Sequence, residues 1–207
     1  DAGEFAAALP AAAAMREFGC DRVPKTAAEC LAIEPALATS AVPIVGGTFT
    51  ASDESGDACR FSELLAQHAA AHGVRFRFGD GVAALQREGG RLAGVRLESG
   101  ETLTADLTVL ALGSYSPLFL RPLGVALPVY PAKGYSATLH LPADAVAPAV
   151  SLTDDGRKLV MSRFGQRLRV AGTAEFNGYD TSLKPRRCAA LRQRIVEIFP
   201  ALASVDR

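Results

Sequence analysis

Two histidines stand four residues apart, a spacing that places both side chains on one face of a helix. His68 and His72 belong to the run His-Ala-Ala-Ala-His, and such a pair can bind one metal ion. The metalloprotease motif has a glutamate directly after the first histidine, where this chain has alanine. The third histidine, His140, lies in a segment that alternates like a strand. The pattern favours two solvated histidines, and we predict no metal site.

Two serines follow a short apolar run and could be nucleophiles. The hydrolase elbow Gly-x-Ser-x-Gly presents such a serine on a sharp turn. The run Gly113-Ser114-Tyr115-Ser116 lacks the second glycine. No histidine is linked in sequence to a suitable acid, so we assign no catalytic residue.

The run Gly-Asp-Gly-Val-Ala-Ala at 79–84 has the spacing of a dinucleotide-binding loop. That loop needs a helix behind it, because the helix N-terminus holds the pyrophosphate. Two glycines at 89–90 arrive too early for such a helix, and residues 91–103 alternate with a turn at 99–100. We predict a meander of strands here instead of a phosphate loop.

The most informative stretch runs from residue 106 to 136. An apolar run at 107–112 predicts a buried strand that returns to a parallel sheet. It breaks at Gly113, where a residue without a Cβ lets the chain turn sharply. Ligands of open α/β sheets bind at the carboxyl ends of the strands. We therefore expect a bound group to approach the main chain at residues 111–114.

The segments around this stretch are of two kinds. Residues 1–38 are rich in helix formers, and Thr26 and Glu29 make a capping box. From Tyr130 onward the segments alternate like antiparallel strands, which argues for a second layer or domain. We predict helices at 59–72 and from Pro185, strands at 74–78, 134–141, 158–164 and 167–173, and a hairpin turn at 165–166.

Composition limits the class of protein. The 207 residues suit one large domain or two small ones. Charges balance at 22 basic and 22 acidic residues, and no aromatic residues interleave with the arginines of the last helix, so we predict no nucleic-acid partner. Four cysteines without CxxC spacing indicate reduced thiols in an intracellular protein. No apolar run approaches the ~20 residues that span a bilayer.

The order of residues in the central stretch is more specific than its pattern. Ala-Leu-Gly-Ser-Tyr-Ser is followed by Leu-Gly-x-x-x-Pro-Val-Tyr-Pro-x-Lys-Gly-Tyr-Ser, and Ala-Gly-Thr-Ala-Glu-Phe stands at 171–176. This order resembles the FAD-dependent family of D-amino-acid oxidase and glycine oxidase, in particular its D-amino-acid dehydrogenases. The resemblance extends from Glu34 to the last helix.

The resemblance implies an α/β protein with two incomplete domains. Residues 1–129 would be part of an FAD-binding Rossmann-like domain, and residues 130–207 part of an antiparallel-sheet substrate domain (α+β). Two family features are not found in the sequence: the N-terminal glycine fingerprint for the FAD pyrophosphate, and the C-terminal segment with an arginine for the substrate carboxylate. The chain therefore resembles an internal fragment of such an enzyme.

The resemblance also implies the reaction and its partners. The expected activity is oxidative deamination of a D-amino acid to a 2-oxo acid and ammonia, with FAD as cofactor. The electron acceptor would belong to the respiratory chain. That implies a cytoplasmic location with peripheral contact to the inner membrane.

Two sets of site residues follow from the resemblance. The strand at Val82 would offer its backbone to the adenine, and the turn after 107–112 would meet phosphate or ribose. Each substrate-side candidate could equally be an ordinary strand residue. The cofactor-binding candidates are Val82, Ala111, Gly113 and Ser114, and the substrate-side candidates are Lys133, Tyr135 and Arg163.

Two alternatives remain open at this point. A related flavin oxidase acting on glycine or another amine would share this region, and rapid reoxidation of its flavin by oxygen would distinguish it. The other alternative is a non-catalytic truncated fragment that binds no cofactor by itself.

Overall fold

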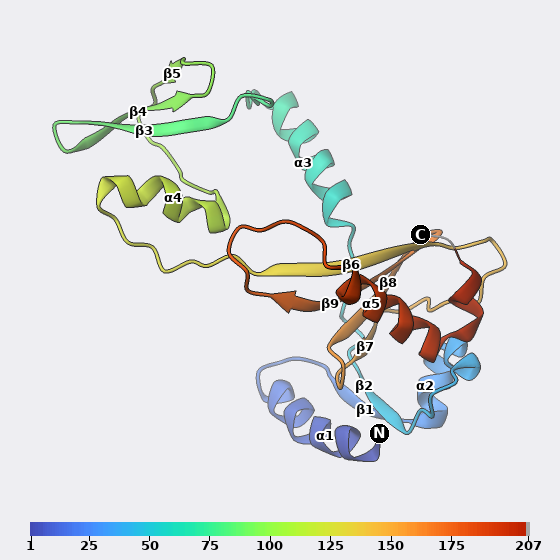
Figure 1. Ribbon diagram of the computed structural model, residues 1–207. Helices are drawn as coiled ribbons and strands as arrows, with labels where there is room; N and C mark the ends of the chain where they lie inside the picture. Colours follow the sequence, from blue (N-terminus) through green and yellow to red (C-terminus); the bar gives the residue numbers. More distant parts are fainter. Residues whose placement is uncertain (206–207) are drawn as a thin grey trace. The chain divides into compact units, whose positions relative to one another are not determined.

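Figure 1 shows the computed structural model, which describes residues 1–205. Its internal contacts divide the chain into two compact units, each considered by itself below. Residues 1–57 pack with the sheet that follows residue 132, so these units differ from the predicted domains 1–129 and 130–207. That division by function stays a prediction. Unit 1 comprises residues 1–57, 133–175 and the segment from 181 onward, and unit 2 comprises residues 58–132 and 176–180.

A four-stranded antiparallel sheet is the centre of unit 1. Its strands lie in the order β6-β9-β8-β7. The predicted alternating strands and the hairpin turn at 165–166 are confirmed. Strand β7 was not predicted, because three residues are too few to show an alternation. The strands are β6 (Lys133–His140), β7 (Leu152–Asp154), β8 (Leu159–Phe164) and β9 (Arg167–Glu175).

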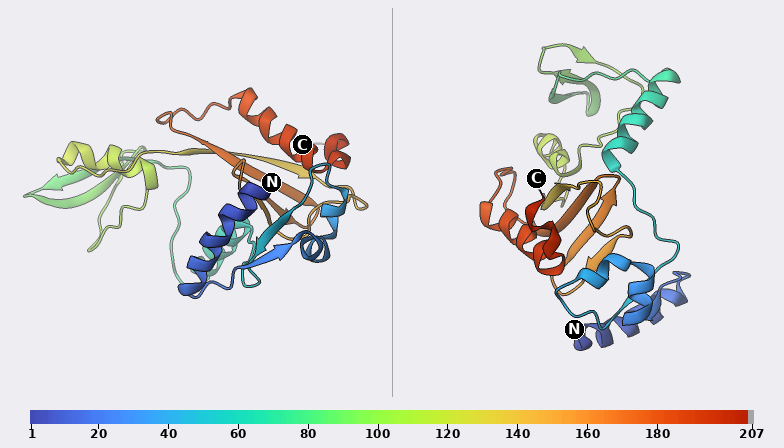
Figure 2. Two further views of the ribbon diagram at one scale, coloured as in Figure 1. Left: turned by 90° about the horizontal axis from the view of Figure 1, so that it is seen from below. Right: turned by 90° about the vertical axis from the view of Figure 1, so that its right-hand side faces the viewer.

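Helix α5 (Pro185–Ile198) covers one face of this sheet (Figure 2). Leu191, Ile195 and Ile198 recur at helical spacing and are buried. Ile195 and Ile198 share a core cluster with the sheet residues Leu168 and Val170, which are almost fully buried. Leu191 packs with Tyr135 and Leu159. The amphipathic helix predicted from Pro185 is therefore confirmed. Ala189, which we expected to point inward, is exposed.

The residues on the opposite face of the sheet can be identified from the alternation of side chains along each strand. Successive side chains of a strand point to opposite faces, and those packed on α5 include Leu139, Met161 and Val170. The residues between them lie on the other side, which we call the open face. On β6, β8 and β9 the open face comprises Ser136, Thr138, His140, Val160, Ser162, Phe164, Arg167, Arg169 and Ala171.

The N-terminal part of unit 1 is a hairpin with helices. The capping box predicted at Thr26 and Glu29 is present, with both reciprocal hydrogen bonds. Strand β2 lies close to the first helix: a Cβ on Gly46 would stand 2.8 Å from the ring of Phe5. The elements are α1 (Ala2–Glu17), β1 (Val23–Thr26), α2 (Ala27–Ile33), the 3-10 helix η1 (Pro35–Thr39) and β2 (Gly46–Phe49).

A buried carboxylate ties this part to the sheet region. Glu34 accepts a hydrogen bond from the N–H of Ala36 at 3.0 Å. It also accepts from the N–H groups of Ala149 and Val150, at 2.6 and 2.9 Å. A buried carboxylate is stable when such donors satisfy its oxygens. Glu34 thus joins segments that are far apart in the sequence.

Unit 2 contains the predicted meander. Its strands pair antiparallel in the order β3-β4-β5, so the rejection of a phosphate loop at 79–84 is confirmed. The predicted helix at 59–72 is also present, as α3. The elements are α3 (Ala58–Ala71), β3 (Val82–Glu88), β4 (Arg91–Leu97), β5 (Thr102–Leu103), η2 (Gly113–Tyr115), α4 (Ser116–Leu120) and η3 (Arg121–Leu123).

Two predicted strands of unit 2 are wrong for this structure. Residues 74–78 and 107–112 form no strand, and Phe78, Leu107 and Val109 are about four-fifths exposed, at 83%, 81% and 78%. An apolar strand of a parallel sheet needs neighbours that cover it. Every strand pair within residues 1–205 is antiparallel, and none includes these segments.

Candidate functional site

The free edge of β3 presents the backbone of Val82. Strand β3 is the outer strand of its sheet, and the Gly81 carbonyl accepts from the N–H of Glu98 at 2.8 Å. Neighbouring residues of an antiparallel strand direct their backbone groups to alternate sides. The N–H and C=O of Val82 therefore point away from β4. This geometry fits the predicted backbone contact with an adenine, which stays a prediction.

The turn at 111–114 is open to an approaching group. Ala111 is exposed and lies in irregular chain before η2, so its predicted place at the end of a strand is corrected. Gly113 has a φ of +53°, a conformation that favours glycine, and no atom lies within 4 Å of where its Cβ would be. The Ser114 carbonyl accepts from Tyr179 Oη at 2.8 Å. The hydrogen bond from Tyr179 fixes the turn, and the space beside Gly113 is free. Both features fit the predicted phosphate or ribose contact.

Two of the three substrate-side candidates converge on one buried carboxylate. Tyr135 is 4% exposed and Glu175 is 7% exposed. Tyr135 Oη donates to Glu175 Oε2 at 2.7 Å, and Lys133 Nζ lies 3.5 Å from the same oxygen. Lys133 also donates to the carbonyl of Ser182 at 2.8 Å. Both candidates therefore have partners inside unit 1.

Two further cations complete what we call the Glu175 cluster: Glu175, Lys133, Tyr135, Lys184 and Arg187. Lys184 Nζ contacts Glu175 Oε1, and Arg187 Nε lies 3.7 Å from Oε2. Lys133 and Arg187 also lie 5.5 and 5.7 Å from the centre of the Tyr135 ring, within cation–π range. The role of Glu175 was not predicted, although the residue belongs to the run Ala-Gly-Thr-Ala-Glu-Phe that carries part of the family resemblance.

Arg163 lies at the other end of the sheet. In the strand register Arg163 pairs with Leu168, whereas Tyr135 pairs with Gly172. Its Nε donates to the carbonyl of Gly165 at 2.9 Å. Arg163 is half-buried and bound to its own hairpin. The structure does not bring it together with the Glu175 cluster.

A β-bulge at Thr173 interrupts β9 next to this cluster. Register pairs join Gly172 to Tyr135 and Ala174 to Gly134, which leaves Thr173 as the extra residue. Its φ is +49°, and within residues 1–205 its buried hydroxyl has no hydrogen-bond partner. A strained residue with an unsatisfied hydroxyl is uncommon. The bulge changes the direction of the end of β9, which contains Glu175.

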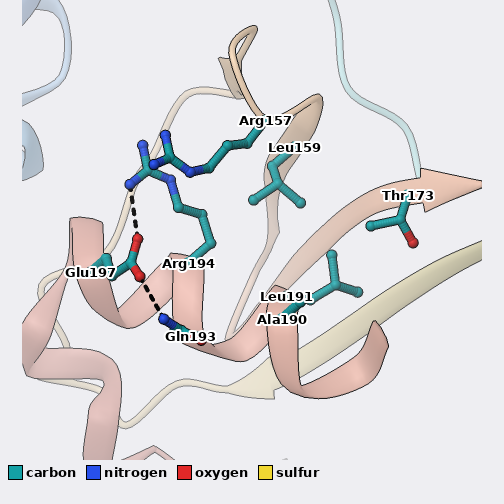
Figure 3. A pocket seen from close by; sticks show the side chains of 8 residues that line it. All are labelled: Arg157, Leu159, Thr173, Ala190, Leu191, Gln193, Arg194 and Glu197. Atoms are coloured by element: carbon teal, nitrogen blue, oxygen red, sulfur yellow. Dashed lines mark hydrogen bonds and ion pairs between the residues drawn. The ribbon is translucent and has the colours of Figure 1, made fainter. Parts of the chain in front are cut away.

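A pocket of about 290 Å³ lies between α5 and strands β8 and β9 (Figure 3). Its charges are paired internally, since Arg194 lies 2.6 Å from Asp154 and 3.1 Å from Glu197. Burial alone would lower the pKa of Arg194, but these hydrogen bonds outweigh it and raise the pKa. We assign this pocket no role in the reaction. Its lining residues are Arg157, Leu159, Thr173, Ala190, Leu191, Gln193, Arg194 and Glu197.

The two histidines lie at the C-terminal end of α3, His68 inside the helix and His72 directly after it, and they contact each other. The rings of His68 and His72 are 4.3 Å apart, and His72 Nδ1 lies 2.8 Å from the carbonyl oxygen of His68. Within residues 1–205 no group of three metal-ligating side chains includes them.

Curated relatives match nearly the whole chain. It is 56% identical to a D-amino acid dehydrogenase of Dechloromonas aromatica, a match that covers 99% of the chain and 50% of the relative. It is 47% identical to a D-amino acid dehydrogenase of Paramagnetospirillum magneticum, which covers 100% of the chain and 49% of the relative. The chain thus spans about half the length of the curated relatives it matches.

Solved structures share the fold. A glycine oxidase from Bacillus cereus superposes with a TM-score of 0.83 at 20% identity, over 96% of this chain and 53% of that one. An L-proline dehydrogenase from P. horikoshii gives a TM-score of 0.77 at 15% identity, over 93% and 52% of the two chains. The predicted fold class is thereby confirmed.

The family model described as FAD dependent oxidoreductase matches residues 2–207. The cofactor in that description is the one that the resemblance implied, and the free β3 edge and the open turn at Gly113 fit such a group. The match extends over both units. The chain belongs to the family of FAD dependent oxidoreductases.

Proposed function

We propose that this chain is part of an FAD-dependent D-amino acid dehydrogenase. The observation that carries the proposal is the 56% identity, over 99% of the chain, to a relative of that name. The glycine oxidase from Bacillus cereus has the same fold, which is consistent with this proposal.

When bound, FAD would accept a hydride from the Cα of the amino acid, and the resulting imino acid would hydrolyse to a 2-oxo acid and ammonia. The residues of this chain would bind and orient. The turn at Gly113 and the β3 edge at Val82 would hold the cofactor through main-chain groups. The Glu175 cluster would fix the Lys133 end of β6 and the end of β9. No residue needs to accept a proton if the amine binds in its neutral form.

A respiratory electron acceptor is the further part of the proposal. It rests on the resemblance to D-amino-acid dehydrogenases, and it would bring the protein to the cytoplasmic side of the inner membrane as a peripheral protein. Across residues 1–205 no helix has both the length and the apolar character needed to cross a bilayer. Flotation of the protein with inner-membrane vesicles, compared with vesicles stripped of membrane proteins, tests this part.

The experiment supplies the other half of the protein from a relative. We define the graft as the Dechloromonas aromatica relative in which the matched half is replaced by these 207 residues. With FAD bound, anaerobic D-alanine should bleach the visible flavin band, and L-alanine should not. A flavin that D-amino acids leave oxidised would contradict the proposal.

A flavin amine oxidase is the second candidate, favoured by the fold likeness to glycine oxidase. The two activities differ in what reoxidises the flavin. Mixing the reduced graft with air-saturated buffer should give slow reoxidation, and a quinone should give fast reoxidation. Rapid reoxidation by oxygen, or better turnover of glycine than of D-alanine, would favour the oxidase.

A further inference from the structure

Four aromatic side chains of unit 2 meet in two pairs. The rings of Tyr115 and Tyr179 lie 5.3 Å apart, and those of Tyr130 and Phe176 lie 6.5 Å apart. Phe176 and Tyr179 belong to residues 176–180, which follow β9 in the sequence but are part of unit 2. Each pair therefore joins this segment to an earlier part of the same unit.

The segment after β9 forms a tight turn with hydrogen bonds of its own. Asn177 Nδ2 donates to Asp180 Oδ2 at 2.8 Å. Tyr130 Oη accepts from the N–H of Gly178 at 2.9 Å. The Tyr179 side chain therefore extends from a main chain that is held on both sides of it.

The Tyr179 hydroxyl reaches the turn at 111–114. Its Oη donates to the carbonyl oxygen of Ser114 at 2.8 Å. Gly113, directly before Ser114, has a φ of +53° and free space where its Cβ would be. Glycine adopts positive and negative φ about equally well, so without this hydrogen bond the turn would leave the observed conformation more often.

We propose that Tyr179 is a positioning residue for the FAD site, whose hydroxyl holds the main chain at Gly113 ready for the ribose or phosphates of the cofactor. The inference rests on the proposed function and on the predicted cofactor contact at residues 111–114. A turn that is fixed before binding does not have to be ordered by the ligand, and this lowers the entropy cost of binding. Tyr179 touches no cofactor atom in this scheme and acts through Ser114.

The experiment compares Tyr179→Phe with the unchanged graft after FAD has been removed from both. Phenylalanine keeps the ring beside Tyr115 and removes only the donor to Ser114. A neutral hydrogen bond contributes modestly to a free energy, so the Kd for FAD should rise about three- to tenfold, which flavin fluorescence measures. The Kd for ADP should rise by the same factor, because ADP carries the ribose and phosphates of FAD without the flavin. The flavin reduction potential should stay unchanged.

Tyr130→Phe is the matched control. It removes a hydroxyl that bonds the same segment at almost the same distance, 2.9 against 2.8 Å, but this bond ends on Gly178 and not on the turn. We expect its thermal midpoint to fall as much as that of Tyr179→Phe. Its Kd values for FAD and ADP should stay within about twofold of those of the unchanged graft. The comparison thus separates positioning of the turn from stability of the segment.

Three results would overturn the role of Tyr179. One is a Kd for FAD that Tyr179→Phe leaves unchanged; another is an equal rise in both tyrosine variants, which would assign the effect to the segment as a whole. The third is weaker FAD binding with unchanged ADP binding, which would assign the contact to the flavin ring. These titrations need no turnover, so they test Tyr179 even if the graft leaves D-alanine unoxidised, a failure that would contradict the proposed function instead.

Discussion

Glu175 is one negative charge among three positive ones, at a buried position. Lys133, Lys184 and Arg187 each lie within 4 Å of its carboxylate, and Tyr135 donates to it. Removing one member of a buried ion pair is costly, because it leaves the opposite charge without a partner. Here one carboxylate serves three cations, so its loss should matter more than the loss of any single cation.

Glu175→Gln in the graft should lower the free energy of unfolding by about 2–4 kcal/mol. This loss is smaller than that expected for a fully buried ion pair, because Lys184 is half exposed. Urea denaturation followed by circular dichroism measures this. Asp155→Asn is the control, since its pair with Lys158 is on the surface, and it should change stability by less than about 0.5 kcal/mol. Equal effects of the two substitutions would contradict the assigned role of the cluster.

At the scale of elements, β8 and β9 pack tightly at Gly172, which pairs with Leu159. A Cβ at this position would collide with Leu159 Cδ2 and would stand 2.9 Å from the carbonyl oxygen of Lys158. Gly172→Ala should therefore destabilise the graft by about 1–3 kcal/mol, because backbone must move to admit the methyl group. Thermal unfolding measures it. Gly134→Ala is matched, since nothing lies within 4 Å of its Cβ, and a loss as large as that of Gly172→Ala would contradict this explanation.

The turn between β4 and β5 should respond to acid. Hydrogen bonds from the Ser99 side chain and backbone lower the pKa of Asp80, and the hydrogen bond from Arg77 lowers the pKa of Glu101. A carboxyl whose pKa is lower in the folded than in the unfolded state stabilises the fold at any pH above its unfolded pKa, which is about 4 for these groups. That stabilisation is lost as the pH falls through the folded-state pKa. The thermal midpoint should fall on acidification from pH 5 to pH 3.

Asp80→Asn provides the comparison, because it removes one of the two titrations. The decrease in the midpoint between pH 5 and pH 3 should be smaller in this variant than in the unchanged graft. An identical decrease in both proteins would show that Asp80 does not contribute.

The elements predicted correctly are those whose signal is local. The capping box at Thr26, the meander after residue 82 and the helix from Pro185 each follow from spacing within a few residues. The strands expected at 74–78 and 107–112 were predicted wrongly. Apolar character indicates that a segment favours burial, but it does not identify the neighbouring strand that would bury it. Glu175 could not be chosen from sequence, because its environment depends on strand register and on the bulge at Thr173.

For the whole molecule, the main question is whether this chain holds FAD by itself. The chain spans about half the length of its curated relatives, and its sequence has no glycine fingerprint for the pyrophosphate. The 207-residue chain mixed with FAD and desalted should be colourless, whereas the graft should keep its yellow band. A stoichiometric flavin band in the 207-residue chain would contradict this prediction.

The three separate segments of unit 1 also bear on synthesis at the ribosome. Residues 1–57 leave the ribosome before residues 58–132, and the four-stranded sheet begins only at Lys133. At about 5–20 residues per second, the intervening segment takes roughly 4–15 s to translate. During that time the Glu34 carboxylate cannot meet the backbone of Ala149 and Val150. Residues 1–57 therefore remain without their sheet partner during this time. Their apolar side chains would be accessible to a ribosome-associated chaperone.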